Sequence, residues 1–204
     1  MGSPLCVDWR AASMSGYNAY MIRSPAYFHP VVTAFAIAVS GVQAFGASPD
    51  PALFEALAAG SGEAWVEAET RILTTWAETG SDALNLIQTR GESALDNGDF
   101  PAAIDHLTAL TDHAPDHAMG YQLRGMAYWL NGDFGPAGAD LARALELEPK
   151  QYLALTQLAA MLEEIGDITR AREALRRSLE IHPRQQDAID AAARLDAVQT
   201  GTNI

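Results

Sequence analysis

The chain has 204 residues, of which 49% are hydrophobic and 19% are charged, a composition typical of a globular protein with a buried core. Its 13 basic and 26 acidic side chains give a net charge of −13, which would repel a nucleic-acid backbone and argues against nucleic-acid binding. Cys6 is the only cysteine, so the chain can form neither an internal disulfide nor a thiolate metal cluster.

Residues 1–47 are expected to be a leader, with a signal peptide at 21–44 behind an unusual upstream extension. Arg23 gives a weakly basic start, the run from Val31 to Val42 is mostly apolar, and Ala44 offers a small side chain for cleavage. The run is shorter than the roughly 20 residues that span a bilayer, so no stable membrane span is expected.

The extension before this signal-like segment leaves its start open. We expect either that translation begins at Met21 or that the residues before it are a disordered lead-in. An uncleaved membrane-anchoring segment and an N-terminal helix packed on the domain are the two alternatives to a cleaved signal peptide. Cleavage predicts an exported, periplasmic protein whose mature chain starts near Phe45, and a cytoplasmic protein is the alternative.

Residues 48–83 are predicted to form a helical hairpin. Asp50 is placed to cap a first helix that has Pro51 at its first position. A second helix is expected over 63–79, because apolar and acidic side chains recur there at helical spacing. These side chains are Trp65, Glu69, Ile72 and Trp76.

One pattern recurs three times in residues 84–185 at a spacing of 34 residues, which divides this part of the chain into units 84–117, 118–151 and 152–185. Each unit carries a glycine followed by aspartate, then an alanine, a leucine and a proline. The recurring residues are Gly98, Gly132 and Gly166, Asp99, Asp133 and Asp167, Ala103, Ala137 and Ala171, Leu107, Leu141 and Leu175, and Pro115, Pro149 and Pro183.

Each recurring residue type has a physical task in a pair of packed helices. Glycine can take the positive φ that ends the first helix, and the aspartate after it can accept hydrogen bonds from the free amides that open the second. The small alanine allows the two helices to cross closely, and proline ends the second helix. The pattern therefore predicts an all-α fold of helix-turn-helix hairpins, each stacked on the next.

This pattern resembles the tetratricopeptide repeat family, whose unit is a 34-residue helix-turn-helix. The resemblance implies a right-handed α-solenoid, in which residues 48–83 lie in phase as a degenerate, shortened unit. The layout of residues 76–91 is also similar to that of exported tetratricopeptide proteins of alphaproteobacteria. The middle unit carries the family signature at Tyr121, Gly125, Tyr128, Gly132, Ala137, Ala144 and Pro149, whereas the early positions hold Ile87, Gly91 and Ala94 in the first unit and Leu155, Ala159 and Leu162 in the third.

Residues 186–199 are predicted to form an amphipathic helix that caps the third unit, and residues 200–204 a loose tail. The expected apolar stripe is thin, with Leu195 just off it. The stripe consists of Ile189, Ala192, Ala193 and Ala197.

No group of side chains predicts catalysis, a cofactor or a metal site. His113 and His117 have metal-ligand spacing, but Pro115 falls between them and breaks the helix, so both are expected to be solvated at a turn. The adjacent carboxylates of 146 and 148, and of 163 and 164, have no histidine partner and are also expected to be solvated. A metal held by His106, Asp112 and His113 is the enzyme alternative.

The resemblance implies a concave groove lined by the first helix of each unit, at positions 2, 5, 9 and 12. These positions carry no basic residue, so binding of C-terminal carboxylates, as in relatives that hold chaperone tails, is not expected. An apolar centre between acidic Glu92 and Glu163 predicts a partner that is apolar in the middle and basic at its ends. The predicted groove residues are Asn85, Gln88, Glu92, Leu95, Met119, Gln122, Met126, Trp129, Leu153, Thr156, Ala160 and Glu163.

The sequence therefore predicts a non-catalytic module that binds a protein or peptide segment in its groove, in the cell envelope. Two other readings are a structural or assembly protein that self-associates through its repeats, and a metal-dependent enzyme. The fold itself does not identify a partner.

Overall fold

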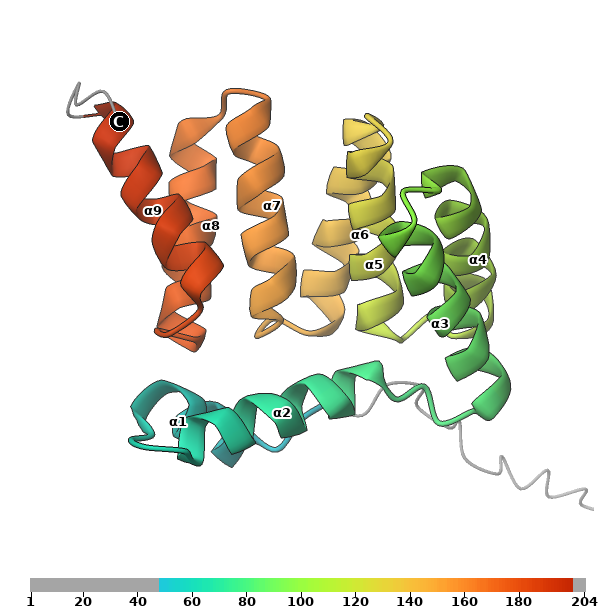
Figure 1. The fold of residues 1–204 in the computed structure, drawn as a ribbon, viewed down its shortest axis with the longest axis horizontal. Helices are drawn as coiled ribbons and strands as arrows, with labels where there is room; N and C mark the ends of the chain where they lie inside the picture. Colours follow the sequence, from blue (N-terminus) through green and yellow to red (C-terminus); the bar gives the residue numbers. More distant parts are fainter. Residues whose placement is uncertain (1–47, 200–204) are drawn as a thin grey trace, which may run out of the picture. The chain divides into compact units, whose positions relative to one another are not determined.

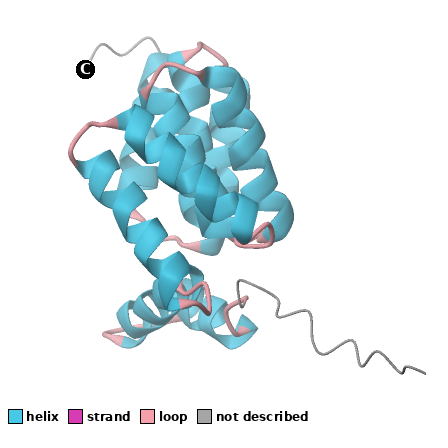
Figure 2. Cartoon of the chain, turned by 90° about the vertical axis from the view of Figure 1, so that its right-hand side faces the viewer, coloured by secondary structure: helices cyan, strands magenta, loops and turns pink. Residues whose placement is uncertain are grey.

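A computed structural model describes residues 48–199, and the expected leader at 1–47, its signal peptide at 21–44 and the tail at 200–204 lie outside the described residues. The described part is entirely helical apart from turns (Figures 1 and 2). None of its helices has the length and hydropathy needed to cross a membrane. The helices are α1 (Pro51–Ala59), α2 (Ala64–Ala77), α3 (Asp82–Asp96), α4 (Phe100–His113), α5 (Ala118–Leu130), α6 (Phe134–Leu147), α7 (Tyr152–Glu164), α8 (Ile168–Ile181) and α9 (Gln186–Gln199).

The three predicted units are the helix pairs α3–α4, α5–α6 and α7–α8, and each second helix packs against the first helix of the next unit. Gly98, Gly132 and Gly166 end the first helices with φ of 72°, 88° and 82°, as the sequence predicts. In each unit the second helix ends two residues before the recurring proline. The described repeats therefore form an all-α solenoid.

The predicted aspartate caps form in two of the three units. Asp99 and Asp167 accept hydrogen bonds from the backbone N–H groups of the third residue after each. Asp133 does not cap α6, because its Oδ2 accepts from the side-chain amide of Asn131 at 2.7 Å instead. The turn between α5 and α6 is therefore held by its glycine and by this local contact.

Close crossing of the paired helices depends on small residues from both partners. Ala103, Ala137 and Ala171 are fully buried, as expected. A Cβ atom added at Gly91 would lie 2.7 Å from the side chain of Leu107, so α3 and α4 can approach only because this position has no side chain. These contacts fix the spacing of the helices that carry the groove residues.

Helices α1 and α2 form the predicted hairpin, with Asp50 accepting from the backbone N–H of Ala52 and Pro51 at the first helical position. The hairpin packs through α1 on α8 and through α2 on α5. It therefore lies across the turns that join one unit to the next, at one end of the repeat helices (Figures 1 and 2). This placement differs from that of a first unit stacked in line with the others.

Helix α9 covers the end of the third unit by packing on α8 and α7, but with a different face from the predicted one. Ala188, Ala191 and Leu195 are its buried residues, whereas Ile189 is 38% exposed and Ala193 is exposed. Leu195 has the largest apolar side chain of the segment after Ile189, and positions three and four residues apart from it share its side of the helix. Because Leu195 sets the buried face of α9, the predicted stripe through Ile189 and Ala193 was wrong.

Candidate binding surface

The structure divides the predicted groove residues of α3, α5 and α7 into buried and accessible sets. Gln88, Leu95, Met119 and Gln122 are buried, so they offer no surface to a partner in this structure, contrary to the prediction. The physical reason is that α1–α2 and the neighbouring repeat helices pack over them. The partly exposed groove residues are Asn85, Glu92, Met126, Trp129, Leu153, Thr156, Ala160 and Glu163.

The hairpin covers the N-terminal ends of the groove helices. Trp76 and Leu57 belong to the same apolar cluster as Met119, and Leu153 packs against that cluster. Asn85, near the start of α3, accepts hydrogen bonds from the backbone and the hydroxyl of Thr79 at 3.0 and 2.7 Å. The predicted groove residues in the C-terminal halves of α3, α5 and α7 that stay partly exposed are here called the open surface: Glu92, Met126, Trp129, Ala160 and Glu163.

The two large apolar side chains of the open surface are held in place by contacts between α5 and α7. The side-chain amide of Gln157 donates to the Met126 sulfur at 3.2 Å. The indole N–H of Trp129 donates to a carboxylate oxygen of Glu164 at 2.7 Å. Because both contacts cross from the second unit to the third, they fix a partly exposed sulfur and a partly exposed ring side by side along the groove.

The charges at the two ends of the open surface are unequal. Glu163 accepts two hydrogen bonds from the Arg194 guanidinium, at 2.9 and 2.7 Å, and this contact holds the pKa of the carboxyl below its usual range. Within the part of the chain that the structure describes, Glu92 accepts only from the neutral side-chain amide of Gln88, at 3.0 Å. The predicted pair of acidic ends therefore has one carboxylate whose charge is compensated by an arginine and one that is not.

The histidine next to Pro115 is part of the core rather than a solvated turn. His117 is 1% exposed, and its Nε2 donates to the side-chain amide oxygen of Gln88, Oε1, at 2.8 Å. Burial lowers the pKa of His117 to about 4, so the ring is neutral at pH 7. Glu148, also expected to be solvated, is buried and accepts from the backbone N–H of Lys150. No cluster of three metal-ligating side chains occurs among residues 48–199.

Sequence reasoning missed a mostly buried ion pair in the middle unit. Arg124 of α5 donates two hydrogen bonds to Asp140 of α6, at 2.7 and 2.8 Å, and one to the Thr111 hydroxyl of α4 at 2.6 Å. The hydrogen bond with Asp140 raises the pKa of Arg124. An arginine inside a helix hairpin with an aspartate on the facing helix is the signal that could have predicted it. The contact joins the first two units and is structural.

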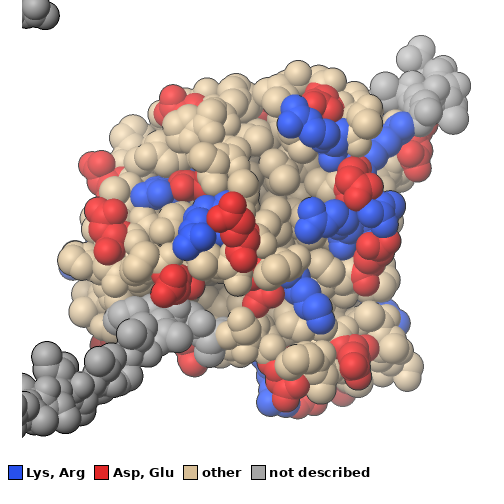
Figure 3. Space-filling model, turned by 180° about the vertical axis from the view of Figure 1, so that it is seen from behind, with Lys and Arg blue, Asp and Glu red and all other residues tan. Residues whose placement is uncertain are grey.

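The remaining arginines do not form a basic surface. They gather mainly towards α8 and α9, where acidic side chains lie between them (Figure 3). Arg176 bonds both Glu173 and Glu180 on the same helix, and Arg170 pairs with Asp167. These pairs compensate the positive charge of Arg170 and Arg176 locally.

Comparison with known proteins identifies the repeats. Residues 89–151 and 123–186 match the tetratricopeptide repeat family. A TPR repeat-containing protein of Rhizobium etli is 29% identical over 87 residues, a match that spans 43% of this chain and 43% of that protein.

Solved structures share the fold at low sequence identity. The first TPR domain of Spaghetti (RPAP3), bound to the HSP90 peptide SRMEEVD, is 20% identical, with a TM-score of 0.55 over 57% of this chain and 93% of that chain. An O-GlcNAc transferase of Thermobaculum terrenum is 23% identical, with a TM-score of 0.53 over 55% of this chain and 22% of that chain. The same helical stack therefore occurs both in a peptide complex and as part of an enzyme.

Proposed function

We propose that this chain is a non-catalytic interaction module that holds a segment of another protein against the open surface. The match of residues 89–151 and 123–186 to the tetratricopeptide repeat family supports the proposal. The observation that carries the proposal is the pair Met126 and Trp129, which stay partly exposed on the groove side of α5 while contacts from α7 fix their positions. Exposed, preorganised tryptophan and methionine are typical of protein interfaces.

The charges of the open surface favour a partner segment with an apolar centre and one basic end. Glu92 is the carboxylate that no arginine compensates, so the basic end should lie over α3. The end over α7 meets the Glu163–Arg194 pair, which is neutral overall. The peptide held by the RPAP3 domain is rich in carboxylates. The open surface has no lysine or arginine of its own to receive such a peptide, so a different partner chemistry is proposed here.

A non-catalytic role agrees with the state of the titratable groups. The groups whose pKa shifts most without an ionic partner are His117 and Tyr152, and both are buried. Neither reaches the open surface, so neither can transfer a proton to a molecule bound there. A similar fold also occurs within an O-GlcNAc transferase. The proposed absence of catalysis therefore rests on the side chains of the open surface and not on the fold.

We also propose that the protein is exported and acts in the cell envelope. The support is the signal-like layout of residues 21–44. N-terminal sequencing of the protein recovered from cells tests this: a mature start near Phe45 is expected, and a start at Met1 would contradict export by cleavage.

Substitution at the groove tests the binding role. A tagged full-length chain is crosslinked in its native cells, the attached protein is identified, and its recovery is compared among variants. Trp129→Ala should reduce recovery at least about 10-fold, as expected for a central aromatic contact. Leu130→Ala is the matched control, because Leu130 is 45% exposed on the neighbouring position of the same helix. Equal recovery of the partner with wild type, Trp129→Ala and Leu130→Ala would show that the open surface does not bind it.

A further inference from the structure

The α1–α2 hairpin packs on one edge of the stacked repeats. We infer that it covers a second docking surface and can detach from it. That surface, here called the turn edge, consists of Lys150, Gln151, Tyr152, His182 and Arg184 at the turns after α6 and α8. We propose that the hairpin detaches as a unit and that the freed turn edge takes a partner helix of the hairpin's own chemistry. The inference holds whether or not a partner binds the open surface.

The contacts between the hairpin and the turn edge are mainly aromatic and apolar. Trp76 of α2 lies with its ring centroid 5.3 Å from that of Tyr152, and Tyr152 meets the ring of His182 edge-on at 4.9 Å. Trp65, in the first turn of α2, lies 6.0 Å from the same histidine. Leu57 and Ile72 are fully buried between the hairpin helices and the repeats. Burial of these side chains supplies the attraction that closes the hairpin.

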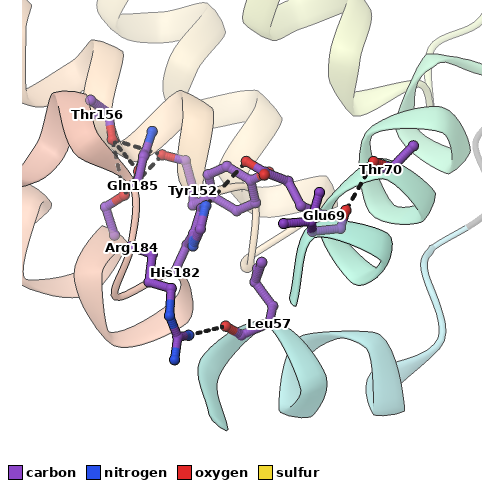
Figure 4. Close-up of polar contacts among 10 residues, drawn as sticks. Leu57, Glu69, Thr70, Tyr152, Thr156, His182, Arg184 and Gln185 are labelled. Atoms are coloured by element: carbon purple, nitrogen blue, oxygen red, sulfur yellow. Dashed lines mark hydrogen bonds and ion pairs between the residues drawn. The ribbon is translucent and has the colours of Figure 1, made fainter. Parts of the chain in front are cut away.

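The polar ties between the hairpin and the turn edge are few and lie at its rim (Figure 4). His182 Nε2 lies 3.1 Å from a carboxylate oxygen of Glu69, and the Arg184 guanidinium donates to the carbonyl oxygen of Leu57 at 3.2 Å. The Lys150 ammonium lies 4.7 Å from the centroid of the Phe54 ring. Glu69, Arg184 and Lys150 each keep contact with solvent, so these ties add little to stability and orient the hairpin without fixing it in place.

Several polar atoms under the hairpin have no hydrogen-bond partner within the described protein. They are the Trp76 indole N–H, the Tyr152 hydroxyl, both amide atoms of Gln151 and Nδ1 of His182. Among the repeat helices, Gln88 pairs with His117 and Thr156 with Gln185, whereas the side-chain amide oxygens of Gln122 and Gln157 also have no partner within the described protein. Burying an unpaired polar group costs free energy. The packed state of the hairpin is therefore less stable than its apolar contacts alone would make it.

The link between the hairpin and the repeats permits movement of the hairpin as a body. Glu78, between the end of α2 and Thr79, has an extended backbone with φ of −78° and ψ of 119°. Thr79 donates through its hydroxyl and its backbone N–H to Asn85 Oδ1, which anchors the end of the link on α3. A change of backbone angles before Thr79 would swing α1–α2 away while the repeats keep their packing. Segments attached in this way open at lower free energy than the whole domain.

The hairpin itself specifies the chemistry of a competing partner. Its inserted side chains follow one helical stripe, with Trp65, Ala68, Ile72 and Trp76 on the packed side and Glu69 facing His182. A partner helix should therefore present large apolar and aromatic side chains at spacings of three to four residues, with a carboxylate beside them. Polar groups of such a helix could also pair with the Gln151 amide or the Tyr152 hydroxyl.

Native-state hydrogen exchange of the full chain tests whether the hairpin opens by itself. The expected result is that amides of α1 and α2 exchange at least about 10-fold faster than the slowest amides of α5 and α7, through an opening that does not expose the repeats. Exchange of all four helices with the same protection and the same response to denaturant would overturn the inference, because it would mean that the hairpin leaves only on global unfolding.

A second test supplies the hairpin as a separate labelled peptide of residues 49–79. Ile72→Asp in the full chain should displace the internal hairpin and raise the affinity for this peptide at least about 10-fold over wild type, because the closed form lowers apparent affinity by the fraction that is open. Val66→Asp is the matched control, since Val66 is 43% exposed on the same helix.

Leu57→Asp is an independent second opening variant that leaves every repeat residue unchanged. No binding by either opening variant with its repeat helices intact, or equal binding by wild type and the opening variants, would overturn the inference. Trp129→Ala should leave peptide binding unchanged, so failure here is separable from failure of the proposed role of the open surface.

Discussion

The rings of Trp76 and Tyr152 pack at a tilt of 53° with their centroids 5.3 Å apart, which joins the second helix of the hairpin to the first turn of the third unit. The contact buries the Tyr152 hydroxyl, which has no hydrogen-bond partner among residues 48–199, and burial raises the pKa of that hydroxyl above its ordinary value. The ring therefore stabilises the closed hairpin while its polar atom opposes burial.

Removing only that hydroxyl should not weaken the protein. Tyr152→Phe is expected to raise the free energy of unfolding by up to about 1 kcal/mol, because the cost of an unpaired buried hydroxyl disappears while the ring contacts remain. Urea denaturation followed by circular dichroism measures the change. Tyr128→Phe, at a partly exposed tyrosine of α5, is the control. A clear loss of stability in Tyr152→Phe would show that the hydroxyl has a partner after all.

The buried His117 should make stability depend on pH. Its pKa is about 4 in the folded protein, below the unfolded value near 6.5, so the unfolded chain binds the proton first as pH falls. Stability is therefore fully present above about pH 6.5 and should fall by about 3 kcal/mol as pH drops towards 4. His117→Gln should remove this part of the decline in chemical denaturation, whereas a variant of the exposed His113 should follow the wild-type curve.

The Arg124–Asp140 pair should behave as a buried ion pair. Asp140→Ala is expected to lower the free energy of unfolding by about 3 kcal/mol, because it leaves a guanidinium in a mostly buried site without its carboxylate. The double variant Arg124→Met with Asp140→Leu should recover most of this loss. Glu146→Ala, which breaks the exposed pair with Arg143, is the control and should have no measurable effect. A double variant that is at least as unstable as Asp140→Ala would argue against coupling between Arg124 and Asp140.

Two glycines of the middle unit should respond oppositely to alanine. Gly132 has φ of 88°, so Gly132→Ala is expected to lower the free energy of unfolding by about 1–2 kcal/mol through backbone strain alone. Gly135 lies in the first turn of α6 with open space where a Cβ atom would stand, and Gly135→Ala should raise stability by up to about 1 kcal/mol. Thermal unfolding compares the two. Equal effects would mean that the turn does not require a positive φ.

The repeat boundaries could be predicted because the determining residues are local. Gly98, Gly132 and Gly166 each end a helix through their own backbone angles, and a proline stops the next helix without help from distant residues. The same holds for Asp50, which caps the helix that directly follows it.

The placement of the hairpin could not be predicted in this way. It depends on contacts such as Glu69 with His182, which lie far apart in the sequence and carry no shared periodicity. For the same reason the sequence did not predict the burial of Met119 and Gln122, two of the expected groove residues. The face of α9 was misread because a stripe of small apolar residues specifies the direction of packing weakly, and Leu195 decides it.

The most direct test of the account is site-specific photocrosslinking in native cells. A photoreactive residue is placed at Met126, on the open surface, or at exposed Leu130, and the adducts are identified. The account predicts that the Met126 position crosslinks to one partner protein through an apolar segment with a basic flank, and that Trp129→Ala abolishes the adduct. Adducts at the Leu130 position alone, or an adduct at Met126 that persists with Trp129→Ala, would contradict it.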